Sequence, residues 1–364
     1  MKYRNLKMVL LWILFFASVL AVFSNKTEIS IYYPSVSARY SEGELTPDIV
    51  ANALETAEVS EEPIGMDITF WGQQKDAKII YNESTATSNM IFYQGNSAQV
   101  YPSKLLAGSY PTSKDRYGCV LSGQLAFILF RNINVVGMSV LYDDNEYIIR
   151  GIFDAGEENL AMIPLDEEQV DKLKLSYTGV EFHGETNSNK EDKAKQVQNK
   201  LGLPATDQIF DGSIWIELIG ALSYIPIIFC MIWMAIRIFY GDTEKIVRTD
   251  ETFESEEKAK SSKGKWIAIG ISGIVALFLP TLLKQIPAWI VPSQWSNFSY
   301  WDTLSDTMRK MWLIWLSAEP GYQDTVIRNL MLKQILLVVL SILGLGIVII
   351  YDMRTKPTIV RMEK

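Results

Sequence analysis

The chain has 364 residues, a formal net charge of −8 and a hydrophobic share of 48%. One histidine and two cysteines are too few for a His/Cys metal cluster or a disulfide framework, and the acidic balance argues against nucleic acid as a partner. The apolar residues gather in long runs, at 8–23, 218–236, 266–283 and 335–351. Runs of this length predict a membrane protein rather than a soluble enzyme.

The first run follows a basic segment that carries Lys2, Arg4 and Lys7. We predict that 1–23 is a transmembrane helix or an uncleaved signal anchor. A cleaved signal peptide has the same basic and apolar order, so removal of this helix stays open. Both interpretations place the chain from residue 24 onward outside the cytoplasm.

The next segment, 24–213, is polar and acidic, which we interpret as a solvated surface. Its apolar residues alternate or recur at helical spacing. This predicts strands and helices in an α+β domain, with strands at 28–33, 66–71 and 88–93 and helices at 47–59 and 189–201. Thr46 and Pro47 are a start signal for the first of these helices, and Gly202 and Pro204 are a stop signal for the second.

The stretch 105–164 has the most informative order of elements. An apolar run at 118–121 precedes a helical-period segment at 123–130, for which Ser122 is a candidate N-cap. Alternating segments then predict strands at 139–142 and 147–153, and the polar residues between them predict a hairpin turn.

This order resembles the extracytoplasmic core domain of MacB-like and FtsX-like ABC transporter permeases. The resemblance rests on an ordered set of positions: Gly108, Val120, Leu121, Ser122, Leu125, Ala126, Leu129, Phe130, Asn134, Val135, Val136, Gly137, Tyr147, Arg150, Gly151, Ile152, Phe153, Met162, Ile163 and Pro164. It implies an α-helical membrane protein with four transmembrane helices and a large extracytoplasmic α+β domain of MacB periplasmic-core type. It also implies an ABC-type ATPase as a separate partner.

The remainder divides into spans and loops. We predict a second helix at 214–240, kinked at Pro226, a cytoplasmic charged loop at 241–265 and a third helix at 266–283. An extracytoplasmic Trp-rich loop at 284–333, a fourth helix at 334–351 and a cytoplasmic tail at 352–364 follow. Lys and Arg are concentrated in the N-terminal segment, the 241–265 loop and the tail. The positive-inside rule therefore places both termini in the cytoplasm of a multi-pass protein of the cell membrane.

The Trp-rich loop contains an amphipathic pattern at 302–316. We predict an interfacial helix that contacts the lipid bilayer through the candidate residues Met308, Arg309, Lys310, Met311, Trp312 and Trp315. A plain loop with packed aromatic residues is the alternative.

The family's coupling helix, which docks on the ATPase, has no legible counterpart here. Glu244, Lys245 and Arg248 lie in the nearest amphipathic piece and are the candidate ATPase-coupling residues. No Walker-type glycine loop occurs, so any ATP hydrolysis resides in a partner chain. We predict no catalytic, cofactor or metal residues. A Cys119–His183 pair is conceivable, but a small buried cysteine is the simpler interpretation.

Two functions fit this sequence. The first is a permease-like subunit that works with a separate ATPase and couples to its extracytoplasmic domain, for export or mechanotransmission of an amphipathic substrate. The second is a membrane-anchored binding or assembly protein that has lost ATPase coupling. A homodimer and a heterodimer with another permease subunit are both open, and the substrate is not specified.

The charge distribution makes a topology prediction. A cysteine introduced at Ser317 should react with a membrane-impermeant reagent in whole cells, whereas one at Ser255 should react only after the cells are permeabilised. Labelling of position 255 in intact cells would contradict the assignment of the 241–265 loop to the cytoplasm.

Overall fold

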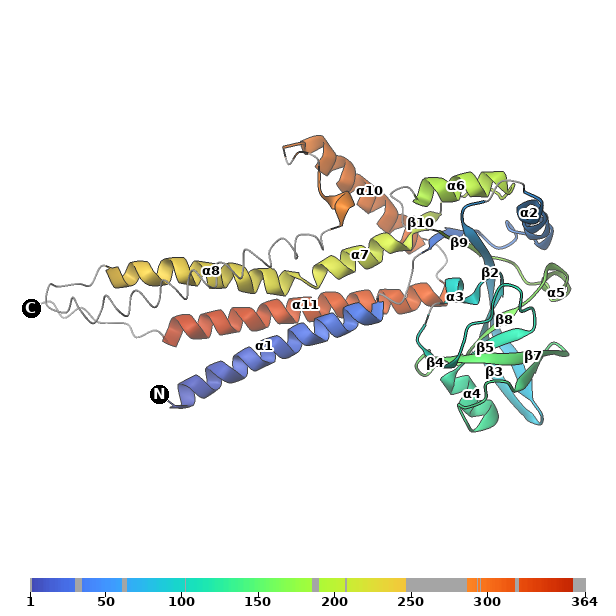
Figure 1. Ribbon diagram of the computed structural model, residues 1–364, viewed down its shortest axis with the longest axis horizontal. Helices are drawn as coiled ribbons and strands as arrows, with labels where there is room; N and C mark the ends of the chain where they lie inside the picture. The colour runs from blue at the N-terminus through green and yellow to red at the C-terminus, as the bar shows by residue number, and fades with distance from the viewer. Residues whose placement is uncertain are drawn as a thin grey trace, which may run out of the picture. The chain divides into compact units, whose positions relative to one another are not determined.

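The computed structural model describes residues 2–29, 35–60, 64–101, 103–184, 190–206, 208–246, 287–292, 294, 296–317 and 321–355. The chain divides into two compact units, and Figure 1 labels most of their helices and strands. The helical unit comprises Met1–Ile29, Glu217–Asn297 and Asn329–Lys364. The sheet unit comprises Ser30–Ile216 and Phe298–Arg328.

The helical unit is built from long apolar helices. They are α1 (Lys2–Ile29), α8 (Ile225–Ile246) and α11 (Tyr322–Thr355), joined by the end of α7 (Gly212–Leu222) and the short η1 (Ala288–Ile290). Three segments of the described residues are long and apolar enough to cross a membrane: Leu6–Ile29, Gly212–Met234 and Tyr322–Met353. The first, second and fourth predicted runs are therefore helical. The third, 266–283, lies outside the described residues, so a count of four stays a prediction.

One local prediction failed where the structure tests it. A strand was expected at 28–33, but Glu28 and Ile29 are the last residues of α1, and 30–33 lie outside the described residues. Tertiary contacts outweigh the alternating pattern there, because Asn25 donates a hydrogen bond to the Gln334 side chain at 2.8 Å and Glu28 lies 3.4 Å from Lys333. Pro226 was expected to kink the second helix, and its effect is stronger than a kink, because the helix is interrupted just before it, between α7 and α8.

The sheet unit contains one mixed sheet, ten-stranded in the described residues, with the order β10-β1-β9-β2-β3-β8-β5-β7-β4 and with β6 paired to β2 and β7. The pairs β3–β8 and β5–β7 are parallel. The strands are β1 (Val36–Arg39), β2 (Asp67–Tyr81), β3 (Ser84–Gln94), β4 (Leu105–Gly108), β5 (Gly118–Ser122), β6 (Ser139–Tyr142), β7 (Asn145–Phe153), β8 (Leu160–Pro164), β9 (Gly179–His183) and β10 (Ile209–Asp211).

Helices complete this unit and make it an α+β fold. They are α2 (Pro47–Val59), α3 (Ser97–Val100), α4 (Gly123–Phe130), α5 (Glu167–Lys172), α6 (Lys190–Lys200), α10 (Phe298–Ser317), and the beginnings of α7 and α11. The expected helices at 47–59 and 189–201 are present as α2 and α6. The segments expected to be strands at 66–71 and 88–93 fall almost entirely within the much longer β2 and β3.

The predicted order within 105–164 is confirmed. β5, α4, β6 and β7 follow one another, and Ser122 accepts a hydrogen bond from the Leu125 amide at 3.2 Å as the N-cap of α4. The hairpin turn between β6 and β7 places Asp143 and Asp144 at φ angles of 47° and 62°. Two successive left-handed residues match the twist of the flanking strands, and short polar side chains tolerate that geometry.

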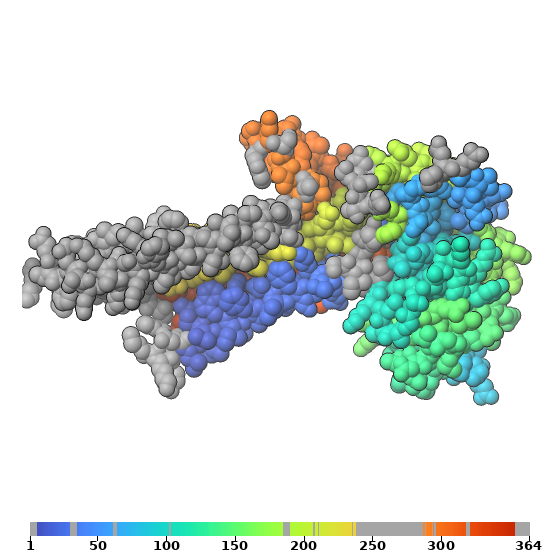
Figure 2. All heavy atoms as spheres, viewed as in Figure 1, coloured from blue at the N-terminus to red at the C-terminus, as the bar shows by residue number. Residues whose placement is uncertain are grey.

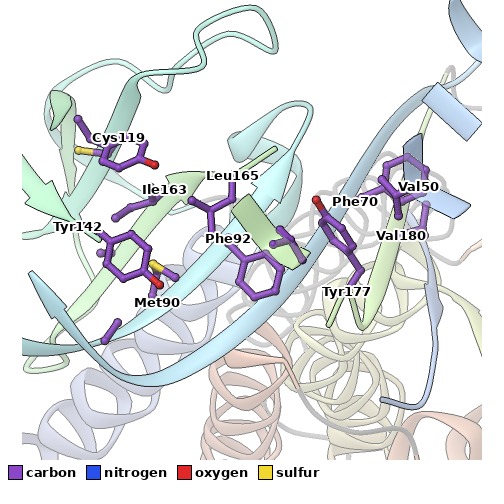
Figure 3. Close-up of a cluster of buried hydrophobic side chains, with 14 of the residues drawn as sticks. Val50, Phe70, Met90, Phe92, Cys119, Tyr142, Ile163, Leu165, Tyr177 and Val180 are labelled. Atoms are coloured by element: carbon purple, nitrogen blue, oxygen red, sulfur yellow. The ribbon is translucent and has the colours of Figure 1, made fainter. Parts of the chain in front are cut away.

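The main hydrophobic core lies on one face of the sheet, under α2 and α4. Phe70, Phe92, Tyr177 and Val180 are fully buried within it, as Figure 3 shows. Cys119 belongs to the same cluster, with no exposed surface. Burial raises the pKa of the Cys119 thiol, as expected for a cysteine that serves as a small apolar side chain.

Two N-cap positions provide a matched stability prediction. Ser122→Ala should destabilise α4 by roughly 1–3 kcal/mol, since it removes a cap and leaves buried backbone groups unpaired. The hydroxyl of Ser122 also donates to the Glu158 carbonyl at 2.8 Å and accepts from the Leu160 amide at 3.1 Å. Thr46→Ala should change little, because Thr46 makes no side-chain cap bond. Hydrogen exchange of the detergent-solubilised chain measures both, and equal losses of protection would contradict the prediction.

Candidate functional site

Three neighbouring strands present a charged face on the side of the sheet opposite the main core. In the strand order β1-β9-β2, Ser37 pairs with Glu181, and Arg39 and Trp71 both pair with Gly179. Residues two apart on a strand share a face, so these side chains lie on one side. The intervening residues, among them Ala38, Val180 and Phe70, belong to the core on the other side.

The carboxylate of Glu181 is the centre of this face. It accepts hydrogen bonds from the Ser37 hydroxyl at 2.6 Å, the Ser35 hydroxyl at 2.8 Å and the Trp71 indole at 3.0 Å. The Arg39 guanidinium lies 3.6 Å away as an ion-pair partner. Glu181 has no exposed surface and Arg39 is 2% exposed. This is therefore a buried ionic network and not a solvated one.

A second carboxylate reaches Arg39 from the beginning of α11. The guanidinium of Arg39 donates to the two oxygens of Asp324 at 3.1 and 3.4 Å, and Asp324 is 3% exposed. The Asp324 carboxylate also accepts from the Gly321 amide at 2.7 Å, which fixes the first turn of the helix. Arg39 is thus held between an acid of the sheet and an acid of α11, with Arg39 and Asp324 separated by 285 positions in the chain.

An aromatic ring completes the site. The Arg39 guanidinium carbon lies 4.4 Å from the centre of the Trp71 ring, a favourable cation–π distance. Trp71 can lie across β9 only because residue 179 is glycine, since a Cβ there would come within 2.4 Å of the indole. The ring shields the ion pair from water, and in a medium of low dielectric the attraction between the charges is stronger.

Two opposing effects act on the pKa of the Glu181 carboxyl, namely its burial and its hydrogen-bonding and charged partners. Burial raises the pKa of the Glu181 carboxyl above its ordinary value, whereas Arg39 and the hydrogen bonds from Ser37, Ser35 and Trp71 act in the opposite direction. Arginine keeps its charge under all ordinary conditions. The arrangement therefore offers no proton-transfer chemistry at Arg39, and what it provides is a specific, directional contact between the strands and the first turn of α11 within the sheet unit.

The helix predicted in the Trp-rich loop is present as α10. Trp315 is 4% exposed and stacks on Trp215 of α7 with ring centres 5.5 Å apart, so its ring has a partner within the protein. Met308 and Met311 are half-buried, whereas Arg309 and Lys310 are exposed. Trp312 is 40% exposed, and Figure 2 shows atoms of α10 (orange) uncovered in this view. Contact of α10 with lipid stays a prediction.

The other residues singled out in the sequence lie elsewhere. Glu244 and Lys245 fall in the last turn of α8, which continues to Ile246, and Arg248 lies outside the described residues. Cys119 of β5 and His183 of β9 lie on strands that do not pair with each other, with β2, β3 and β8 between them in the strand order. Cys119 is fully buried in the main core, as the simpler interpretation expected.

Sequence reasoning missed the buried network, although one signal was present. The segments 36–39 and 179–182 alternate between apolar residues and polar or charged ones. Such alternation usually indicates a strand with one solvated face. That this charged face is buried becomes evident only from the register of β1, β9 and β2 and from the contact that Asp324 of α11 makes with Arg39.

Comparison with known proteins found solved structures that are similar to part of this chain. No family model and no curated protein matches the chain. It is similar to the extracellular domain of YknZ, a noncanonic ABC-type transporter from Gram-positive bacteria, at 12% identity and a TM-score of 0.33, over 47% of this chain and 95% of that one. It is also similar to the periplasmic region of MacB from Actinobacillus actinomycetemcomitans, at 13% identity and a TM-score of 0.34, over 46% of this chain and 84% of that one.

The network predicts the effect of removing its outer carboxylate. Asp324→Ala should loosen the first turn of α11 and strands β1 and β9, at a cost of roughly 3–5 kcal/mol, because Arg39 keeps its buried charge and loses one partner. Hydrogen exchange of the full-length protein in detergent measures this as faster exchange in those segments. Asp306→Ala, which removes an exposed carboxylate on α10, is the control and should leave them unchanged. Equal exchange in both variants would show that Asp324 does not hold the helix.

Proposed function

We propose that this chain is a permease-like membrane subunit that works with a separate ATPase and transmits motion between the membrane helices and an extracytoplasmic sheet unit. The observation that carries the proposal is the buried contact between Arg39 and Asp324. Asp324 lies in the first turn of α11, and the same unbroken helix continues through the candidate membrane span Tyr322–Met353.

The length and continuity of α11 support this role. Its 34 residues give a rod of about 51 Å, more than the ~30 Å hydrocarbon core of a bilayer. A continuous helix resists bending, so an axial displacement of its membrane part is passed to its first turn. Since that first turn is held by a charge-assisted hydrogen bond in a buried setting, the displacement acts on β1 and β9 instead of being lost at an exposed contact.

At its far end, α11 has a second ionic contact. Arg237 of α8 donates to the Asp352 carboxylate at 3.0 Å, and Asp352 is 8% exposed. α8 continues beyond Arg237 to Ile246, through the candidate coupling residues Glu244 and Lys245. A force applied to the end of α8 by an ATPase would therefore reach α11 through this ion pair. ATP hydrolysis itself belongs to the partner chain.

The transmitted motion would serve one of two ends. It would export an amphipathic substrate, or it would drive an external process through the sheet unit. The exposed apolar residues of α10, Leu313 and Leu316, are 54% and 46% exposed and offer a surface for such a molecule or for lipid. The part of the chain that the structure describes has no group of His, Cys, Asp and Glu residues suited to a metal ion.

A membrane-anchored binding or assembly protein without ATPase coupling is the second candidate. One observation favours it: the predicted coupling piece at 243–248 begins as the last turn of α8, without a helix of its own in the described residues. In this case the Arg39–Asp324 contact would only hold the first turn of α11 within the sheet unit.

Affinity capture distinguishes the two functions. We expect a tagged full-length chain, purified from its native membrane, to retain an ATP-binding cassette protein identified by mass spectrometry. Replacing Glu244, Lys245 and Arg248 together by alanine should abolish that retention. The Asp324→Ala variant should still retain the ATPase, because Asp324 lies at the start of α11, whereas α8 and its coupling residues contact the other end of α11 through Asp352.

The same complex tests transmission. Trapping the ATPase with ATP and vanadate should change hydrogen exchange in β1 and β9 of the wild-type chain, and the change should be largely lost in the Asp324→Ala variant. If no ATPase is retained by the wild-type chain, the assembly function stands. If one is retained but trapping leaves β1 and β9 unaffected, coupling through this contact is wrong.

A further inference from the structure

The helical unit contains a break in the middle of a candidate membrane span. α7 ends at Leu222 and α8 begins at Ile225, within the candidate span Gly212–Met234. The turn is formed by short-range bonds from the Ser223 amide to the Gly220 carbonyl at 3.3 Å and from the Tyr224 amide to the Ala221 carbonyl at 3.1 Å. In an unbroken helix the amide of residue 226 would bond to the carbonyl of Leu222, but Pro226 has no N–H to donate.

Side chains from two other helices hold this break. Gln334 of α11 donates from its amide nitrogen to the Ser223 hydroxyl at 2.8 Å, and the amide oxygen of Gln334 accepts from Asn25 of α1 at 2.8 Å. Gln334 and Ser223 have no exposed surface, and Asn25 is 2% exposed. Buried amides in apolar surroundings are costly to leave unpaired, so this chain of hydrogen bonds favours one arrangement of α1, α7 and α11.

A cation reinforces the same point. The Lys26 ammonium of α1 donates to the Tyr224 hydroxyl at 2.9 Å and lies 4.4 Å from the centre of the Tyr224 ring. The two residues of the break, Ser223 and Tyr224, are thus each bound by a neighbouring helix. A break that merely ended a helix would not require a specific polar partner for each of its residues.

The break separates two segments with different attachments. α7 follows β10 directly, and its first turn is capped by Asp211, which accepts from the Ser213 amide at 2.8 Å. α8 leads in the other direction, to Arg237 and the candidate coupling residues. We propose that Ser223 and Tyr224 form a hinge, clamped by Gln334 and Lys26, at which α8 changes direction relative to α7. This deepens the proposed transmission, because it lets α8 move while α7 stays with the sheet.

Distance measurements in the intact protein test the hinge. Spin labels at Leu218 of α7 and Ile236 of α8, in a chain with Cys119→Ala and Cys230→Ala, report the angle through double electron–electron resonance in nanodiscs. Labels at Leu332 and Ile350, the same number of residues apart on the continuous α11 and 66% and 48% exposed, are the rigid control. We expect a broader distance distribution for the α7–α8 pair than for the α11 pair.

Two kinds of substitution should move that distribution in opposite directions. Pro226→Ala restores the missing donor and should narrow it to the width of the α11 pair, whereas Gln334→Leu or Lys26→Met removes a clamp and should widen it. Lys26→Met serves if Gln334→Leu fails to assemble. An α7–α8 distribution as narrow as the α11 control, or one that Pro226→Ala leaves unchanged, would overturn the hinge. No ATPase or nucleotide is present, so the outcome is independent of whether the chain couples to one.

Discussion

The buried guanidinium of Arg39 is the constraint on which the arrangement of the sheet unit depends. Because arginine cannot lose its charge on burial, the fold must supply anions, and it does so from Glu181 and Asp324. One acid comes from the neighbouring strand and the other from a helix at the opposite end of the chain. The segment Phe298–Arg328 is therefore an integral part of the sheet unit, although its flanking residues belong to the helical unit.

Local structure could be predicted from the sequence where the signal was itself local. The helix α4 and its Ser122 cap, the turn at Asp143 and Asp144, and the end of α6 two residues before Gly202 all follow from spacing and from the residues at each boundary. At Glu28 and Ile29 the sequence predicted the start of a strand, but contacts from α11 keep the end of α1 helical. Alternation and helical period differ little over six residues, and a distant partner decides between them.

The candidate site could not be predicted from the sequence for a related reason. Arg39 and Glu181 each lie in a short segment that alternates between apolar and polar residues, and nothing near either one in the sequence indicates the other. Their contact depends on β9 lying between β1 and β2, which is a matter of strand order and not of local pattern. Trp315 illustrates the same difficulty. Its amphipathic helix was predicted, but the ring of Trp215 on which it stacks lies a hundred positions earlier.

The two edges of the sheet have a consequence for how copies of this protein can meet. β10 has three residues and runs straight into α7, and β4 has four residues with an irregular register against β7. Strands this short expose few unpaired amides and carbonyls, so they give a second sheet little to extend. Association through these edges, and with it the growth of a continuous intermolecular sheet in a crowded membrane, is disfavoured.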